Sequence, residues 1–320
     1  MFGAGVSLRN RLYDRGTIRS FRLQAPVVSI GSLSAGGAGK TPFLIMLGRL
    51  LKQRGLAFDV LSLGYGRRTV GVALVDPTGS PQEFGDEPLL IARKLGAPVI
   101  VGEDRYAAGK FAEEKFGLQV HLLDDGFQHR RLARDFDIVL VTDRDLQDSL
   151  LPVGRLREPL SSLSRATAIV LMDGAASDRV SLRKSQLVLR VSRSIVPPET
   201  SEACFAFCGI ARPQNFFADL RNVGVRVAGM REFRDHHVYS AADIQLLLRL
   251  RQQSGATAFV TTEKDAVNLG GHLSRLQPIH LVRVCMLFKH PTIAEAILAE
   301  AFAEQLHKLI VRQNQDRVRE

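Results

Sequence analysis

The sequence predicts an α/β protein with a mostly parallel sheet, helices on both of its faces, and a second, smaller α/β domain. Three observations lead to this prediction. Apolar runs of strand length alternate with helical stretches through most of the chain. Glycine stands just past the end of several of these helices, as C-cap chemistry favours. A glycine-rich turn joins the first strand to the first long helix, which is typical of a strand–loop–helix unit in a parallel sheet.

The first half of the chain alternates strand and helix in a regular order. Strands are predicted at residues 27–30, 58–63, 98–101, 118–123, 136–142 and 167–171. Helices are predicted at residues 41–54, 87–95 and 104–116, closed by Gly55, Gly96 and Gly117. Residues 72–75, followed by Asp76-Pro77-Thr78-Gly79, predict a hairpin insertion into this order.

The composition changes between Ser192 and Ser201, where Pro197-Pro198 interrupts the pattern and predicts a linker. Beyond it, strands are predicted at 203–208, 225–229, 257–261 and 279–284, and helices at 214–221, 240–253 and 291–306. The chain would then consist of an N-terminal segment (1–24), a larger α/β domain (25–195) and a smaller α/β domain (196–320).

Composition narrows the classes of protein further. With 45% hydrophobic and 24% charged residues among 320, the chain can bury a sizeable core, as soluble globular proteins do. The net charge of +10 indicates an anionic partner: a nucleotide, a nucleic acid or a membrane surface. Three cysteines without a C-x-x-C pair favour a reduced, cytosolic setting. No apolar run reaches the roughly 20 residues that span a bilayer, and the first residues lack a cleavable signal pattern.

The N-terminal segment is basic and mildly amphipathic. Its apolar residues are interleaved with arginines, and Asp14 is its one acidic residue; the arginines are Arg9, Arg11, Arg15, Arg19 and Arg22. A helix of this kind can lie on an anionic membrane surface. Arg9 falls inside the apolar sector of a helical wheel, however, so a helix packed on its own domain explains the pattern equally well.

The segment from Val27 to Thr41 carries the strongest functional signal. An apolar run ending in Gly31 leads into Ser34-Ala35-Gly36-Gly37-Ala38-Gly39-Lys40-Thr41, and a helical pattern follows. Glycines let successive backbone N–H groups point inward at phosphate oxygens. Lys40 would then contact the β- and γ-phosphates, and Thr41 would hold Mg²⁺ through its hydroxyl. Ser34 stands where glycine usually begins the pattern, but a turn without ligand leaves Lys40 and Thr41 unexplained. We therefore infer a P-loop that binds a nucleoside triphosphate.

A second signal is the pair Asp124-Asp125, which ends an apolar strand and continues into Gly126-Phe127-Gln128-His129. Carboxylates at this edge of the sheet meet the magnesium–phosphate complex in P-loop proteins. Two adjacent carboxylates also repel each other unless a cation is near, which points to a metal. The alternative is a solvated Asp-Asp-Gly turn. His129 is either a phosphate contact or a supporting or surface histidine.

Two further segments offer charged side chains. In Gly85-Asp86-Glu87-Pro88, Asp86 either caps the next helix or presents a carboxylate to the phosphate region. In the segment 154–159, Arg155 or Arg157 can compensate charge on a transferring phosphoryl group, and Glu158 can bind the metal or its waters. Taken alone, that second segment is better explained by a surface ion pair.

The smaller domain contributes Asp235-His236-His237, just before a predicted helix. A histidine beside a carboxylate can be held in one tautomer and act as a general base. Asp235 can also be an ordinary loop residue, and the further Asp and His clusters of a metal-dependent phosphodiesterase are missing. The segment 261–265 has the residues of a guanine-reading motif in the wrong order, so Lys264 and Asp265 are interpreted as capping residues or nucleotide contacts.

Together these segments resemble the tetraacyldisaccharide 4′-kinase family, the lipid A 4′-kinases. The matching motifs, in chain order, are Ile30-Gly31, Gly36–Pro42, Gly64–Arg67, Gly85–Pro88, Asp124–His129, Gly154–Pro159, Cys208–Ala211, Asp235–Tyr239 and Thr261–Val267. Their order and spacing extend over nearly the whole chain, which is far more specific than any single motif. Ser32 stands where the family usually has Asn, and the N-terminal segment is shorter and less apolar than the family's membrane-seated helix.

The resemblance implies ATP- and Mg²⁺-dependent phosphorylation of the 4′-hydroxyl of a tetraacyl disaccharide 1-phosphate in lipid A biosynthesis. It implies peripheral attachment at the cytoplasmic face of the inner membrane of Gram-negative bacteria. The family's catalytic carboxylate falls on Asp86 and its partner histidine on His236, which together take the proton from the sugar hydroxyl. Because Asp86 falls in the predicted larger domain and His236 in the smaller one, we expect domain closure to complete the site.

The other site positions follow from the same resemblance. Lys40 and Asp125 are expected to act in catalysis beside Asp86 and His236. The expected metal ligands are Thr41, Asp124 and Glu158. Candidate contacts to substrate or phosphate are Glu87, His129, Arg155 and Arg157.

Two other classes of protein compete with this interpretation. A regulatory P-loop NTPase that transfers nothing would leave Asp86 and His236 without a role. A nucleic-acid-linked ATPase is suggested by the charge alone, because 7% aromatic residues and no Trp provide no basic stripe interleaved with stacking rings. We therefore expect a lipid substrate and an anionic membrane surface as partners, and the sequence indicates neither a nucleic acid nor a protein partner.

Overall fold

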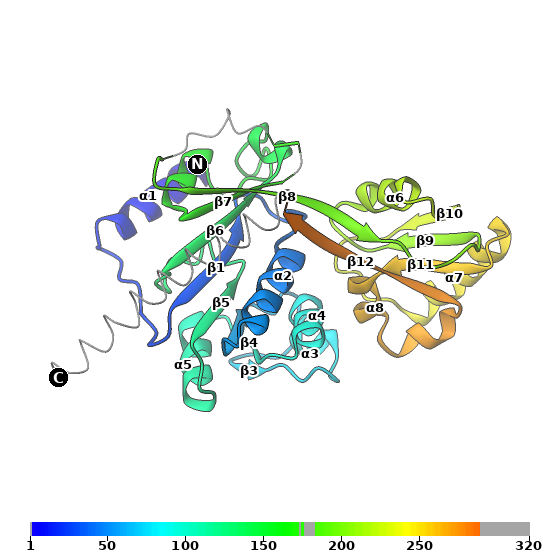
Figure 1. Ribbon diagram of the computed structural model, residues 1–320, viewed down its shortest axis with the longest axis horizontal. Coiled ribbons are helices and arrows are strands. Elements are labelled where there is room, and N and C mark those ends of the chain that lie inside the picture. Colours follow the sequence, from blue (N-terminus) through cyan, green and yellow to red (C-terminus); the bar gives the residue numbers. More distant parts are fainter. Residues whose placement is uncertain (1, 173, 176–182, 289–320) are drawn as a thin grey trace. The chain divides into compact units, whose positions relative to one another are not determined.

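The computed structural model describes residues 2–172, 174–175 and 183–288, and within them the chain packs as two compact units (Figure 1). The first unit holds the described residues up to Leu63, those from Gly102 to Arg193, and Met286–Phe288. The second holds Gly64–Val101 and Ser194–Cys285. This division differs from the expected domains in two respects, because residues 64–101 pack with the second unit and Met286–Phe288 pack with the first.

The first unit is built on a sheet with the strand order β8-β7-β6-β1-β5-β2, in which neighbouring strands pair in parallel. The strands are β1 (Val27–Ser32), β2 (Phe58–Ser62), β5 (Val120–Asp124), β6 (Phe136–Val141), β7 (Ala168–Met172) and the first part of β8 (Leu187–Val196). The helices are α1 (Phe2–Asp14), α2 (Lys40–Gln53) and α5 (Arg105–Lys115), with 3-10 turns η1 (Asp143–Leu146) and η2 (Leu160–Arg165). The strand order reverses at β1, so the carboxyl ends of β1 and β5 form the edge at which open α/β sheets bind ligands.

The strands β1, β2, β5, β6 and β7 of this sheet are completely buried, as expected for parallel strands covered on their faces, whereas strand β8 is partly exposed. A hydrophobic cluster supports the carboxyl edge of the sheet; it consists of Leu33, Phe127, Val139, Val141, Leu156, Leu163, Ala166, Ile169, Leu171 and Ala175. Position 31 requires glycine, because a Cβ there would lie only 2.5 Å from the Cβ of Phe127. In the described part of the chain, no helix combines the length and the hydropathy that a bilayer span requires.

The second unit contains a parallel sheet with the order β10-β9-β11-β12. Its elements from the C-terminal half are β9 (Cys204–Cys208), α6 (Pro213–Asn222), β10 (Val227–Glu232), α7 (Ala241–Ser254), β11 (Ala258–Thr262), α8 (Glu263–Leu269), η4 (Gly270–Leu276) and β12 (Ile279–Phe288). Residues 64–101 add β3 (Ala73–Leu74), α3 (Pro81–Phe84), α4 (Asp86–Leu95) and β4 (Val99–Val101). Helix α4 packs against α8, which brings two distant parts of the sequence together.

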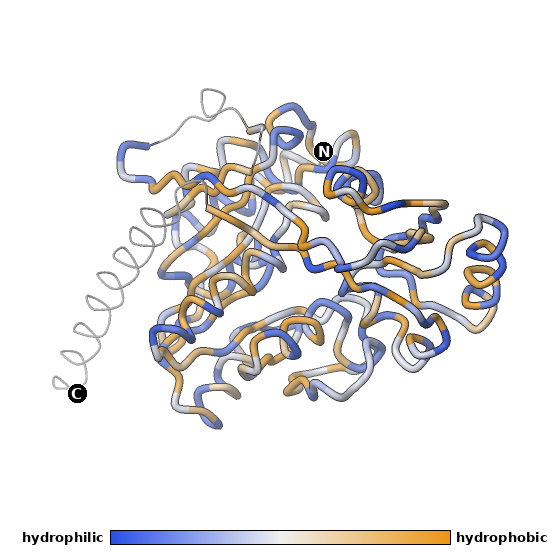
Figure 2. Tube along the Cα trace, turned by 45° about the vertical axis from the view of Figure 1, so that its right-hand side comes forward, coloured by the Kyte–Doolittle hydropathy of each residue, from blue (hydrophilic) through white to orange (hydrophobic). Residues whose placement is uncertain are grey.

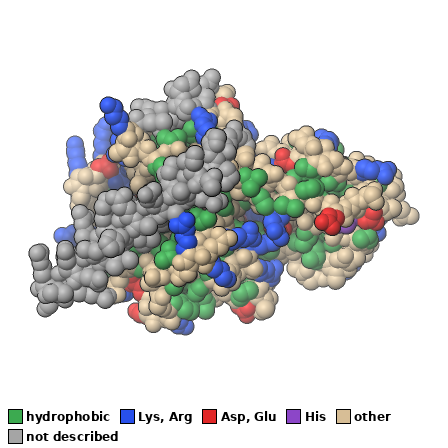
Figure 3. Space-filling model, in the orientation of Figure 1, with side chains coloured by type: hydrophobic (Ala, Val, Ile, Leu, Met, Phe, Trp, Pro, Cys, Tyr) green, Lys and Arg blue, Asp and Glu red, His purple; other side chains and the backbone are tan. Residues whose placement is uncertain are grey.

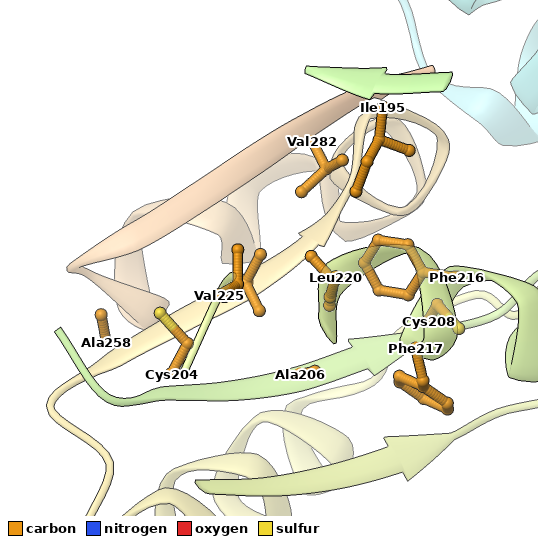
Figure 4. Packing of buried hydrophobic residues seen from close by; sticks show 11 residues of the cluster. Ile195, Cys204, Ala206, Cys208, Phe216, Phe217, Leu220, Val225, Ala258 and Val282 are labelled. Atoms are coloured by element: carbon orange, nitrogen blue, oxygen red, sulfur yellow. The ribbon is translucent and has the colours of Figure 1, made fainter. Parts of the chain in front are cut away.

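Two apolar clusters hold the second unit together. One lies between β9 and α6 and includes Phe216, Phe217 and Leu220 (Figure 4). The other is aromatic, and in it Phe207 packs edge-on against both Phe259 and Tyr239. Along the helical turns the hydropathy alternates between hydrophobic and hydrophilic residues, as expected for helices with one buried face (Figure 2).

The expected mostly parallel α/β fold is confirmed, and each predicted strand and helix of the described residues lies within a few residues of an observed one. The linker predicted from Ser192 is wrong at its start, because β8 continues to Val196 and ends at Pro197-Pro198. Residues 73–74 pair antiparallel with β4 instead of forming their own hairpin. The helix predicted at 291–306 lies outside the described residues.

Candidate active site

The phosphate-loop segment turns between β1 and α2 through three glycines with positive φ. These are Gly36 (φ 73°), Gly37 (φ 69°) and Gly39 (φ 84°), and Gly39 also caps α2. A side chain is strained in this backbone region, so glycine is the residue that permits the turn. Helix α2 begins directly at Lys40-Thr41, so its N-terminal N–H groups and the loop amides form a cradle suited to an anion.

The beginning of the loop is held by the segment that contains Arg155 and Arg157. The amide of Ala35 donates to the Arg155 carbonyl at 3.0 Å, and the amide of Arg157 donates to the Leu33 carbonyl at 2.7 Å. Two motifs that lie about 120 residues apart in the sequence therefore form one short antiparallel bridge, between Ser34 and Leu156.

Asp125 joins the two cations of this edge. Both terminal nitrogens of the Arg157 guanidinium donate hydrogen bonds to the Asp125 carboxylate, at 2.8 and 2.7 Å. On the other side, Lys40 Nζ lies 3.4 Å from Asp125 Oδ1. Lys40 Nζ also donates to Ser32 Oγ at 3.3 Å. Burial by itself would raise the pKa of Asp125, but Arg157 and Lys40 lower it to about 2. The structure thus brings together Lys40, Asp125 and Arg157, as the sequence predicts.

Asp124 ends β5 directly beside β1, in register with Ile30. Its Oδ2 accepts a hydrogen bond from Ser62 Oγ at 2.9 Å, and its side chain is buried. Mg²⁺ in phosphate sites takes one or two carboxylates together with substrate phosphates and water, so the oxygens of Asp124 and Thr41 are ligands of a suitable kind. Among the described residues, no three His, Cys, Asp or Glu side chains form a cluster that could hold a metal without a nucleotide.

Glu158 makes contacts of a different kind. Its buried carboxylate accepts hydrogen bonds from Asn10 Nδ2 at 2.7 Å and from Arg165 at 2.9 and 3.2 Å, and Arg9 lies 3.6 Å away. Burial tends to raise the pKa of Glu158, but Arg165 and Asn10 lower it. In this structure Glu158 fixes helix α1 to the body of the first unit, and none of these contacts involves Thr41 or Asp124.

The remaining predicted contacts of the first unit are Arg155 and His129. Arg155 Nε pairs with Asp148 Oδ2 at 3.0 Å. Burial and the neighbouring Arg105 lower the pKa of His129 to about 4, so its imidazole is neutral at pH 7. A neutral ring among arginines adds no charge of its own to a phosphate site.

In the second unit, the motif Gly85–Pro88 packs on the turn that contains Gly64 and Tyr65. A Cβ at Gly85 (φ 88°) would lie 3.0 Å from the Tyr65 carbonyl oxygen, and one at Gly64 (φ 70°) would lie 2.9 Å from the Phe84 carbonyl oxygen. The two glycines therefore allow two backbone segments to touch. This contact positions the start of α4, whose first residue is Asp86; the helix is capped by Gly85 and not by Asp86.

Asp86 and His236 form a hydrogen-bonded pair within the second unit. His236 Nδ1 lies 2.9 and 2.8 Å from the two Asp86 oxygens, and Asn268 Nδ2 donates to Asp86 Oδ2 at 3.0 Å. Burial would raise the pKa of Asp86, but His236, Lys264 and Asn268 lower it to about 2. Because an ionised carboxylate only accepts, Nδ1 carries the hydrogen, and neutral His236 presents Nε2 as an acceptor.

The geometry corrects one expectation. Asp86 and His236 both belong to the second unit, where their contact is already formed, so closure of two domains is not needed to bring them together. Glu87, the neighbour of Asp86, lies 3.4 Å from Lys264 Nζ. Asp265 instead accepts hydrogen bonds from Tyr239 Oη and the Gly209 amide inside the unit, which makes it a structural residue.

Sequence reasoning missed Asn268 and did not connect Lys264 with the Asp86–His236 pair. Both residues lie on α8, four positions apart, and therefore on one face of that helix. A spacing of four between polar residues in a short helix was the available signal. It gains meaning only once α8 is known to pack on α4.

Comparisons with known proteins agree with the motifs. The family model described as tetraacyldisaccharide-1-P 4′-kinase matches residues 1–303. The chain is 49% identical to a tetraacyldisaccharide 4′-kinase of Koribacter versatilis over 98% of its own length and 97% of that protein's length. It is 39% identical to one of Syntrophus aciditrophicus over 84% of its length and 82% of that protein's. It is also similar to a crystal structure of LpxK from Aquifex aeolicus in complex with ATP, with a TM-score of 0.75 and 31% identity over 98% of this chain and 96% of that one.

Proposed function

The chain belongs to the tetraacyldisaccharide-1-P 4′-kinase family, and we propose from this premise that it transfers the γ-phosphate of ATP to the 4′-hydroxyl of a tetraacyl disaccharide 1-phosphate. The observation that carries the proposal is the Asp86–His236 pair, with Nδ1 bound to the carboxylate and Nε2 directed elsewhere. A regulatory NTPase that only hydrolyses its nucleotide has no need for a base that activates a sugar hydroxyl.

The first unit binds ATP in this proposal. The loop amides and the N-terminus of α2 hold the phosphates, and Lys40 and Arg157 compensate the charge that develops on the γ-phosphoryl group. Thr41 and Asp124 would hold Mg²⁺, which would add positive charge to compensate the phosphates when bound. The contacts of Glu158 with α1 argue for a supporting role at the edge of this site rather than for direct metal binding.

The second unit activates the acceptor. His236 Nε2 takes the proton of the 4′-hydroxyl as its oxygen forms the new bond to the γ-phosphorus, and the bond to the ADP oxygen breaks. Asp86 holds the imidazole in the required tautomer and stabilises the imidazolium that results. Both units are needed, because the P-loop belongs to one and the base to the other.

Helix α1 supports the placement of the enzyme at the cytoplasmic face of an anionic membrane. Asn10 is buried against the first unit, whereas Phe2 and Leu8 are 41% and 60% exposed. Exposed arginines, among them Arg11 and Arg15, accompany these apolar side chains. A helix with one packed face and an exposed basic and apolar face is suited to peripheral binding at anionic lipids.

The test is transfer of ³²P from γ-labelled ATP to a tetraacyl disaccharide 1-phosphate in detergent micelles with Mg²⁺. We expect labelled lipid from this substrate and none from an analogue that lacks the 4′-hydroxyl. Hydrolysis of ATP at the same rate with and without the lipid, and with no labelled lipid, would contradict the proposal and favour a regulatory NTPase.

A further inference from the structure

Lys264 lies at the centre of the charged cluster around the proposed base. Its Nζ is 3.4 Å from His236 Nε2, 3.3 Å from Asp235 Oδ1, 3.4 Å from Glu87 Oε1 and 3.7 Å from Asp86 Oδ2. The side chain is 16% exposed, so solvent screens these contacts only in part. The ammonium therefore faces three carboxylates and the nitrogen that is meant to accept the substrate proton.

The charges around His236 come from three elements. Asp86 and Glu87 belong to α4, Asp235 precedes α7, and Lys264 belongs to α8. The ring of Tyr65 covers the imidazole from another side, with the ring centres 5.1 Å apart. Asp86 and Asp235 lie 2.8 and 3.7 Å from the imidazole nitrogens and favour the protonated form of the ring, which cannot accept a proton. Lys264 is the cation of this cluster that opposes them.

We propose that Lys264 is a positioning residue that opposes the protonation of His236 by Asp86 and Asp235 and so favours the form in which Nε2 accepts a proton. Two groups lie near Nε2: the Lys264 ammonium at 3.4 Å, which can only donate, and the Asp235 carboxylate at 3.7 Å, which can only accept. The closer contact, with Lys264, favours a lone pair on Nε2. The contact thus selects the same tautomer as the hydrogen bond from Nδ1 to Asp86. The inference rests on the proposed role of His236 as the base and adds what sets its protonation state.

The pKa directions agree with this geometry. Burial lowers the pKa of His236, the hydrogen bond with Asp86 raises it, and Lys264 lowers it again, with a net rise. Without Lys264, burial alone would oppose the carboxylates. Burial tends to lower the pKa of Lys264 itself, but Glu87, Asp86 and Asp235 raise it, so the lysine stays charged at any pH at which the enzyme works.

The direct test is an NMR titration of the His236 ring in the full-length protein, assigned by the signal that His236→Gln lacks. In Lys264→Met, the pKa of His236 should rise by about 1 to 3 units. Lys264→Arg keeps the positive charge and should keep the pKa near the wild-type value. Lys94→Met is the matched control, because Lys94 pairs with Glu263, the neighbour of Lys264, and not with the His236 cluster. An unchanged pKa of His236 in folded Lys264→Met would overturn the inference.

A second measurement separates this inference from the proposed function. The acid limb of the pH profile of phosphate transfer should move to higher pH in Lys264→Met, with activity recovering as the pH is raised, and should stay in place in Lys264→Arg. A uniform loss of activity at every pH, with no shift in the titration, would mean that Lys264 has only a structural role. A titration shift without movement of the acid limb would support the inference on Lys264 and overturn the assignment of His236 as the base.

Discussion

Two residues of the candidate site adopt a backbone conformation that side chains disfavour. Asp125 has φ 49° and His236 has φ 56°, and they are the non-glycine residues with positive φ in the described part of the chain. Such a conformation costs roughly 1–2 kcal/mol and persists only where other contacts hold it. Arg157 and Lys40 hold Asp125, and Asp86 holds His236. The strained positions coincide with the residues to which the sequence motifs assign chemistry.

The contacts of Asp125 predict an effect on nucleotide affinity. Its carboxylate binds Lys40 and Arg157, the cations that a triphosphate would also bind. Asp125→Asn removes this competing charge, so we expect ATP to bind a few-fold more tightly in calorimetric titrations without Mg²⁺, while phosphate transfer falls. Asp14→Asn, which removes an exposed carboxylate on α1, should leave the affinity unchanged. Weaker binding by Asp125→Asn would show that the carboxylate orders the two cations more than it competes for them.

A buried histidine predicts how the stability of the first unit depends on pH. His121 Nδ1 lies 2.8 Å from Asp59 Oδ1, and its Nε2 lies 3.5 Å from Glu113. Burial lowers the pKa of His121, but the two carboxylates raise it to about 9. The stabilisation is therefore complete below the unfolded value of about 6.5 and is lost as the pH rises through 9. We expect the Tm to fall by several degrees between pH 7 and 10.

The variant that isolates this effect is His121→Gln, which should be less stable at pH 7 and should lose less Tm over the same pH range. Calorimetry or circular dichroism measures both quantities. The same pH slope in the variant and in the wild type would assign the effect to other groups.

At the scale of elements, helix α1 is attached by residues next to both motifs of the nucleotide edge. Glu158 binds Asn10, and Arg130 donates to the Asn10 carbonyl at 2.9 Å and to Asp14 at 2.7 Å. Arg157, the neighbour of Glu158, binds Asp125. The sequence allowed α1 either to bind a membrane or to pack on its own domain. These contacts show that one face of α1 packs firmly on the first unit.

This attachment predicts a loss of stability in Glu158→Gln. The change removes the charge of the fully buried Glu158 from the half-buried Arg165, so we expect about 3 kcal/mol of destabilisation and faster tryptic cleavage within α1. Arg22→Gln is a suitable control, because Arg22 is 60% exposed and Asp135 keeps its hydrogen bond from the Val27 amide; such pairs contribute about 1 kcal/mol or less. Equal effects of the two substitutions on unfolding by urea would show that burial of Glu158 does not matter.

Elements with a clear pattern could be predicted from the sequence, whereas others, among them β8 and α8, could not. Strand β8 has polar residues at several positions and runs into Pro197-Pro198, so its composition resembles that of a linker. Helix α8 has seven residues, too few for a helical period to stand out. The residues of contiguous motifs, such as Lys40 and Asp125, could be found. Asn268 could not, because its contact with Asp86 spans 182 positions and depends on the packing of α4 on α8.

At the scale of the whole molecule, the order of the chain does not follow the order of the units. The chain leaves the first unit after Leu63, returns at Gly102, and enters the second unit again at Ser194. Dividing the chain into consecutive domains therefore places Asp86 in the wrong unit, although its predicted partner, His236, is the one that it contacts. Packing between distant segments, and not local pattern, decides this assignment.

The net charge of +10 predicts that the protein binds to membranes of anionic lipids. Lys and Arg side chains predominate over acidic ones on the face shown in Figure 3. We expect binding to anionic vesicles that weakens with salt, and a roughly ten-fold loss of binding in the double variant Arg11→Gln/Arg15→Gln. The control Arg49→Gln/Arg54→Gln removes the same charge from exposed positions at α2. Equal losses in co-sedimentation would contradict a specific role of α1.

Two steps are assigned to different residues: the Asp86–His236 pair activates the acceptor hydroxyl, and the P-loop binds ATP without help from that pair. The most direct measurement compares Asp86→Asn with the wild type in two assays: the Kd for ATP and the rate of ³²P transfer to the tetraacyl disaccharide 1-phosphate. We expect an unchanged Kd and a transfer rate at least about 100-fold lower, because the amide no longer supports the base. A transfer rate close to that of the wild type would contradict this assignment.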